Sequence, residues 1–403
     1  MDIPEELILR IFEAAAPRAN LTHVSPGLPC VHPQRSTLYN TCLVNRQFNR
    51  IGRPLLYRHL HLRQGLTVDH SPTGPTNKLA RVLFANPNLG LHCRDLMFSL
   101  RHDYEPDDPR RSVILSCATS WFKNVRRLCF IIRHGRPNEA RDLIRSLPHL
   151  EDLEIVCEKN SYELRSLLDS VNIPSLKNLS VNSAMEICLP AKEDCNVPFS
   201  SLRLQGATPT PADLAQLLSH SRGLEHFSLR DYVLCNIGRS LRSFGDILLP
   251  YRDTLKSIEL VTNRSALDDV NPDFPDLSPF HQLQCLALSI LGLVSCTPDY
   301  VASRRLIPRL RRLIVELNPS SGGSLDVYVE EEEKWLCEFI RSISAQGLAP
   351  VELHLAFGGP NIRPEWLECK AHVEWSKSKA LLNICGSCGI LLAMYTGPPH
   401  MLE

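Results

Sequence analysis

A six-residue motif recurs along the chain, with apolar residues at its first, fourth and sixth positions. Full copies lie at 57–62, 93–98, 125–130, 150–155, 176–181, 224–229, 255–260, 283–288 and 310–315, and partial copies at 201–204 and 351–355. Helical patterns separate several copies, at 139–147, 161–170, 210–221 and 330–346. A short strand and a helix in each unit can bury an apolar edge only against neighbouring units. The pattern therefore predicts an α/β solenoid over residues 57–358.

The repeating unit resembles the leucine-rich repeat, whose signature is L-x-x-L-x-L in a strand followed by a helix. The Asn or Cys that usually follows the last leucine is mostly absent, so the copies are similar to the irregular kind. A generic α/β domain with a parallel sheet is the alternative. Because the last repeat of a solenoid exposes its apolar edge, residues 359–403 are expected to form a C-terminal cap.

Alternate residues of a strand point to opposite sides, so the residue between the last two apolar positions is expected to line the concave face of the solenoid. These residues are His61, Met97, Cys129, Glu154, Ser180, Arg203, Ser228, Glu259, Ala287, Ile314 and His354. The candidate target-binding residues among them are Glu154, Ser180, Arg203, Ser228 and Glu259. The row mixes both charge signs with apolar side chains, which disfavours nucleic acid and fits a protein target.

The first residues predict an amphipathic helix. Asp2 can cap it, Pro4 suits its first turn, and Pro17 ends it. Its apolar stripe consists of Leu7, Ile8, Ile11, Phe12 and Ala15. Residues 17–35 hold several prolines and are expected to form a loop.

Residues 36–55 predict a second amphipathic helix. Its apolar stripe consists of Val44, Phe48, Ile51 and Leu55. Another face carries the arginines Arg46, Arg50 and Arg53. Gly52 and Pro54 are expected to end the helix. We interpret the arginines as a solvated face, and the apolar stripe as the working one. A unit below about 40 residues normally needs a partner to bury its apolar surface.

These two segments resemble the F-box. The resemblance rests on Ile3, Pro4, Glu6 and Leu7 at the start, on Ile11, on the run Leu43, Val44, Arg46 and Phe48, and on the closing LLYRHL. Phe48 stands where Trp is usual, and the loop between the helices is longer than usual. The resemblance implies a short helical domain at residues 1–60 that precedes the solenoid.

An F-box implies binding to a Skp-family adaptor, which links a cullin scaffold and a RING subunit into a ubiquitin ligase. The residues that the resemblance assigns to this contact are Ile3, Pro4, Leu7, Ile11, Leu43, Val44 and Phe48. The implied function is a non-catalytic substrate-recognition adaptor, whose repeats bind a protein target for ubiquitination. The alternative is an interaction scaffold that assembles no ligase.

Composition and motifs exclude other classes. The chain balances 44 basic against 44 acidic side chains, which argues against a dedicated nucleic-acid binder. No P-loop, G-x-G-x-x-G, G-x-S-x-G or H-E-x-x-H motif occurs, so neither an enzyme nor a cofactor is expected. The fifteen cysteines are scattered, and the start MDIPEELILR lacks a basic signal region. Reduced thiols in cytoplasm or nucleus are therefore expected.

Two features of the C-terminal part have competing interpretations. Cys369, His372, Cys385 and Cys388 have pair spacings that suit a structural zinc site, although buried thiols that only pack are the favoured alternative. The uncharged run 380–395 is shorter than the roughly 20 residues that span a bilayer. We expect it to form a buried helix, turn and strand, with a membrane tether as the alternative.

Overall fold

The computed structural model divides into two compact units, which are described separately. The first unit holds Met1–Asn182 and Pro190–Pro198, and the second holds Ser183–Leu189 and Phe199–Glu403. The residues that the structure describes are 4–15, 33–64, 75–100, 118–132, 137–157, 164–168, 171–182, 197–206, 209–232, 242–262, 276–289, 297–305, 310–317, 330–348, 350–357 and 378–396.

The first unit begins with three helices and continues with five strands. The helices are α1 (Glu5–Ala15), α2 (Pro33–Cys42) and α3 (Arg46–Leu56). The strands are β1 (His59–Gln64), β2 (Asp95–Leu100), β3 (Arg127–Ile132), β4 (Asp152–Cys157) and β5 (Asn178–Asn182). Between the strands lie α4 (Pro75–Ala85), the 3-10 helix η3 (Pro87–His92), α6 (Pro137–Arg145) and α7 (Leu164–Leu168).

The second unit alternates strands with helices in the same way. Its strands are β6 (Ser201–Gln205), β7 (His226–Tyr232), β8 (Ser257–Thr262), β9 (Cys285–Ser289), β10 (Arg312–Leu317), β11 (Glu352–Phe357) and β12 (Leu391–Thr396). Its helices are α8 (Pro211–Ser219), α9 (Arg242–Leu248), the 3-10 helix η5 (Leu249–Tyr251), α11 (Pro298–Arg305), α12 (Glu330–Ala345) and α14 (Lys379–Ser387).

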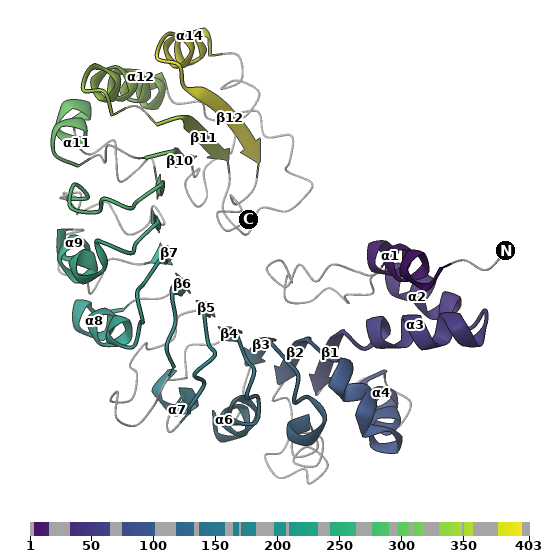
Figure 1. The fold of residues 1–403 in the computed structure, drawn as a ribbon. Coiled ribbons are helices and arrows are strands. Elements are labelled where there is room, and N and C mark those ends of the chain that lie inside the picture. The colour runs from purple at the N-terminus through teal and green to yellow at the C-terminus, as the bar shows by residue number, and fades with distance from the viewer. Residues whose placement is uncertain are drawn as a thin grey trace. The chain divides into compact units, whose positions relative to one another are not determined.

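Within each unit the strands are parallel and follow one another in sequence order. The motif copies align in register, so that Leu60, Leu96 and Leu128 are neighbours across β1, β2 and β3. The helices that connect the strands lie on one side of them in each unit (Figure 1). The fourth and sixth motif positions point to that side and are buried, as Leu153 and Ile155 are in β4. All eleven copies form strands, which confirms the α/β class.

The last strand, β12, lies beyond the last recognised copy of the motif. It pairs in parallel with β11. It follows α14 through a turn at Gly389, whose φ of 69° favours glycine. Residues 379–396 therefore form the helix, turn and strand predicted for the uncharged run. The expected burial is only partial, because Leu382 is 46% exposed and Leu391 64%.

The N-terminal helices differ from the prediction at two points. Residues 36–55 form two helices rather than one, since α2 ends at Cys42 and α3 begins at Arg46. Asn45 causes the break, because its side-chain Oδ1 accepts a hydrogen bond from the backbone N–H of Phe48 at 2.7 Å. Gly52 and Pro54 lie inside α3 and do not end it. Pro54 removes one N–H donor, but α3 continues to Leu56 because Leu55 belongs to the core.

Candidate protein-interaction surfaces

The three N-terminal helices share a small core of their own. Its buried members are Ile8, Phe12, Leu38 and Leu55, and the half-buried Phe48, Ile51 and Leu56 pack against them. Phe12 and Phe48 meet edge to face, with ring centroids 5.5 Å apart. Phe48, which the resemblance assigns to a partner, therefore contributes mainly to this core.

Four other residues that the resemblance assigns to a partner are exposed. Leu7 is 50% exposed, Ile11 60%, Leu43 64% and Val44 67%, and we name these four the exposed apolar set. Pro4 is also exposed, whereas Ile3 lies outside the described residues. Large apolar side chains cost free energy when they face water.

The arginines of α3 lie at the surface, as predicted. Arg46, Arg50 and Arg53 are exposed, and the guanidinium of Arg50 forms an ion pair with Glu5 of α1. At the surface such a pair contributes little free energy. The buried apolar side chains therefore hold α1, α2 and α3 together, and the arginines keep the opposite face hydrated.

The predicted row of residues on the strand face is in register in the first unit. His61, Met97, Cys129, Glu154 and Ser180 are consecutive neighbours across β1 to β5. Glu154 and Ser180 are half-buried. Met97, Cys129 and Ile131 form a buried apolar cluster on this side. Burial, and then the nearby Glu154 carboxylate, raise the pKa of the Cys129 thiol. On this face of the strands, a buried apolar cluster in β2 and β3 therefore lies next to polar residues in β4 and β5.

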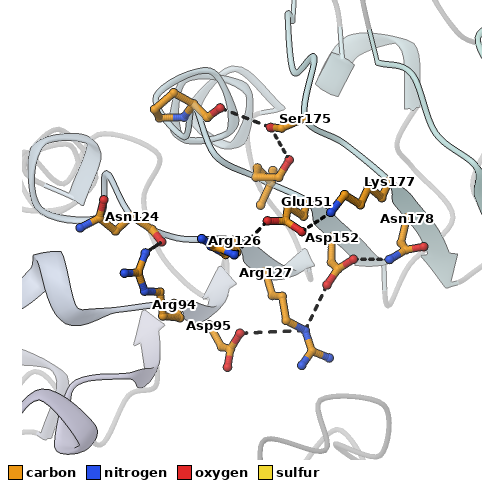
Figure 2. Close-up of polar contacts among 12 residues, drawn as sticks. Arg94, Asp95, Asn124, Arg126, Arg127, Glu151, Asp152, Ser175, Lys177 and Asn178 are labelled. Carbon is orange, nitrogen blue, oxygen red and sulfur yellow. Dashed lines mark hydrogen bonds and ion pairs between the residues drawn. The ribbon is translucent and has the colours of Figure 1, made fainter. Parts of the chain in front are cut away.

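A ladder of alternating charges crosses the same face two residues earlier in each strand (Figure 2). Nε of Arg127 lies 3.9 Å from a carboxylate oxygen of Asp95 and 3.3 Å from one of Asp152. Asp152 in turn accepts a hydrogen bond from the side-chain amide of Asn178, and His59 forms a close pair with Asp95. Opposite charges on neighbouring strands stabilise a sheet. The sequence pattern did not single out this ladder.

A second row lies at the residue that precedes each strand. Its members are Arg58, Arg94, Arg126, Glu151 and Lys177, and we name this row the basic edge. Glu151 pairs with both Arg126, at 3.3 Å, and Lys177, at 2.7 Å (Figure 2). The hydrogen bond from Lys177 is the main cause that lowers the pKa of Glu151. Arg94 donates instead to the backbone carbonyl of Asn124, at 3.1 Å.

The row predicted from the motif is also in register within the second unit, but part of it is buried there. Arg203, Ser228, Glu259, Ala287, Ile314 and His354 are consecutive neighbours across β6 to β11. The Ser228 hydroxyl donates to a carboxylate oxygen of Glu259 at 2.5 Å. Ser228 and Glu259 are both buried, while Arg203 is half-buried. Of the five candidate target-binding residues, only Glu154, Ser180 and Arg203 are therefore partly accessible.

Arg230 links Glu259 to a second buried carboxylate, that of Glu316. Its guanidinium pairs with Glu259 through Nε and with Glu316 through Nη2. To reach β10 the side chain extends past β9, which presents the short side chains of Ala287 and Ser289 on this face. The sequence pattern missed Arg230 and Glu316, although each lies two residues after a member of the row and so shares its face.

The zinc hypothesis finds no support among the described residues. In that part of the chain no group of three or more His, Cys, Asp or Glu side chains could hold a metal ion. Cys369 and His372 lie outside the described residues. Cys385 is buried, which raises the pKa of its thiol to about 11, and Cys388 is half-buried. Both cysteines lie at the C-terminal end of α14.

The described helices include none that is long and apolar enough to cross a membrane. No family model matches this chain, and no curated protein matches its sequence.

Proposed function

We propose that the chain is the substrate-recognition subunit of a Skp–cullin–F-box ubiquitin ligase. In this proposal α1, α2 and α3 form an F-box, and the parallel strands with their helices form an irregular leucine-rich-repeat solenoid. The subunit performs no bond chemistry. It raises the effective concentration of a bound target near the ubiquitin-carrying enzyme.

The exposed apolar set carries this proposal. Leu7, Ile11, Leu43 and Val44 are each at least half exposed, although the same helices bury a complete core of other apolar residues. Folding of the helices therefore does not require the exposed apolar set. Burial of such side chains in the groove of a Skp-family adaptor would contribute on the order of 1–3 kcal/mol each.

Co-expression with a Skp-family adaptor, followed by size exclusion, tests the proposal. We expect the full chain to elute as a one-to-one complex with the adaptor. The double variant Leu7→Ala/Val44→Ala should lose the complex, because it removes two of the exposed side chains. Val351→Ala, which truncates a 61% exposed valine of the second unit, is the matched control and should retain it. Retention of the complex by the double variant would contradict the assignment of this surface.

The alternative function is a scaffold that binds the adaptor without assembling a ligase. Addition of a purified cullin–RING pair to the adaptor complex distinguishes the two. A larger complex that contains cullin supports the ligase subunit. A complex that excludes cullin supports the scaffold. In either case Glu154, Ser180 and Arg203 are the proposed contacts for the protein target, and the cytoplasm and nucleus are the proposed compartments.

A further inference from the structure

The basic edge places like charges on neighbouring positions. Backbone hydrogen bonds connect the row step by step, from Arg94 N–H to the Arg58 carbonyl at 2.9 Å and from Arg126 N–H to the Arg94 carbonyl at 2.8 Å. Arg58, Arg94 and Arg126 therefore follow one another with no carboxylate between them. Glu151, the next member, is shared by Arg126 and Lys177. The row thus carries four cations and one carboxylate.

Like charges on neighbouring strands are destabilising. Elsewhere in the same unit, charges of opposite sign alternate from strand to strand. One residue further along, the ladder alternates Asp95, Arg127 and Asp152. In the second unit the corresponding edge pairs Lys256 with Glu225 one to one, at 2.7 Å. The three consecutive arginines of the basic edge depart from this alternation of charge.

Two of these arginines present their guanidinium groups to solvent. Arg58 is exposed and forms no ion pair with any described residue. Arg126 is 58% exposed in its side chain despite its contact with Glu151. Lys123 is also exposed, and it directly precedes Asn124, whose carbonyl accepts the hydrogen bond from Arg94. The partner that fits this edge therefore carries negative charge.

We propose that the basic edge binds an acidic peptide segment of a partner protein through its carboxylate side chains. Neighbouring strands lie about 4.8 Å apart, and alternate side chains of an extended peptide are about 7 Å apart. Arginine side chains are long enough to compensate for the mismatch between these two spacings, and each can bind a carboxylate with two parallel hydrogen bonds. The row is narrow, because Asp95 and Asp152 come directly after it in the sequence. Such flanking carboxylates disfavour a continuous phosphate backbone and favour a short peptide.

Fluorescence anisotropy with the full chain tests this inference, which does not depend on adaptor binding by the exposed apolar set. The probe is a short fluorescein-labelled peptide in which Glu alternates with Gly, and the reference is the same peptide with Gln in place of Glu. We expect saturable binding of the Glu peptide only, weakening as salt is added. The variant Arg58→Gln/Arg126→Gln should bind about tenfold more weakly.

The matched control is Arg222→Gln/Arg252→Gln, which removes two exposed arginines of the second unit and should leave the affinity unchanged. Three results would overturn the inference. They are no saturable binding of the Glu peptide by the wild-type chain, equal affinity of the two double variants, or tighter binding of a single-stranded oligodeoxynucleotide that the Arg58/Arg126 variant weakens. The last result would assign the edge to nucleic acid.

Discussion

Arg230 is the residue on which the buried charges of the second unit depend. Its side chain is 6% exposed, and those of its partners Glu259 and Glu316 are 3% and 1% exposed. Removal of one partner from such a group leaves an uncompensated charge in the interior. We expect Arg230→Met to lower the free energy of unfolding by about 3–5 kcal/mol, measured by urea denaturation. Arg222→Met, at an exposed site, should change it little; an equal loss in both variants would refute the role of the buried pairs.

Gly52 shows a second constraint at the scale of one residue. A Cβ atom at this position would lie 2.5 Å from Sγ of Cys42 and 3.1 Å from the Phe12 ring. Gly52→Ala should therefore destabilise the three N-terminal helices by about 1–3 kcal/mol, through overpacking. Gly386 in α14 has nothing within 4 Å of such a Cβ, so Gly386→Ala should be neutral or stabilising. Protease susceptibility of the N-terminal helices measures the difference, and similar cleavage of Gly52→Ala and the wild type would contradict it.

At the scale of the element, α3 depends on its N-terminal cap. The Asn45 side chain satisfies the N–H of Phe48, and the break before it leaves Leu43 and Val44 in a turn. We expect Asn45→Ala to destabilise α3 by about 0.5–2 kcal/mol. Amides of its first turn should then exchange hydrogen faster, measured by mass spectrometry. Asn45→Asp keeps an acceptor and should restore the protection; faster exchange in both variants would show that the cap is not the cause.

At the scale of the whole molecule, stability is expected to be local, because each strand pairs only with its neighbours in the sequence. Phe130 of β3 is fully buried and stacks on Phe98 of β2, with ring centroids 5.7 Å apart. Phe130→Ala should lower the free energy of unfolding by about 3–5 kcal/mol. Hydrogen exchange should increase in β2, β3 and β4, and stay unchanged in β10 and β11. Leu355→Ala in β11 is the reciprocal control, and a uniform increase along the chain in either variant would indicate global unfolding instead.

The sequence predicted the strands well because the motif depends only on the spacing of apolar residues within one strand. Positions four and six of each copy are apolar, and an extended chain must turn both toward the same side. The register of the predicted row, from Glu154 to Ser180 and from Arg203 to Ser228, followed from the same spacing. The motif does not extend to β12, which the uncharged run predicted instead. The prediction failed at Asn45, where one polar side chain divides a continuous apolar stripe.

By itself, the sequence determined the α/β class, the positions of the strands along the chain, the side toward which their apolar residues point, and the amphipathic character of α1 and α3. Only the tertiary structure decided which apolar side chains of these helices are buried, because Ile8 and Ile11 are equally apolar and differ only in what packs against them. It likewise decided that Glu259 is buried with Arg230 and Glu316. That pairing crosses from β7 to β10, and spacing along one strand carries no information about side chains that meet across several strands.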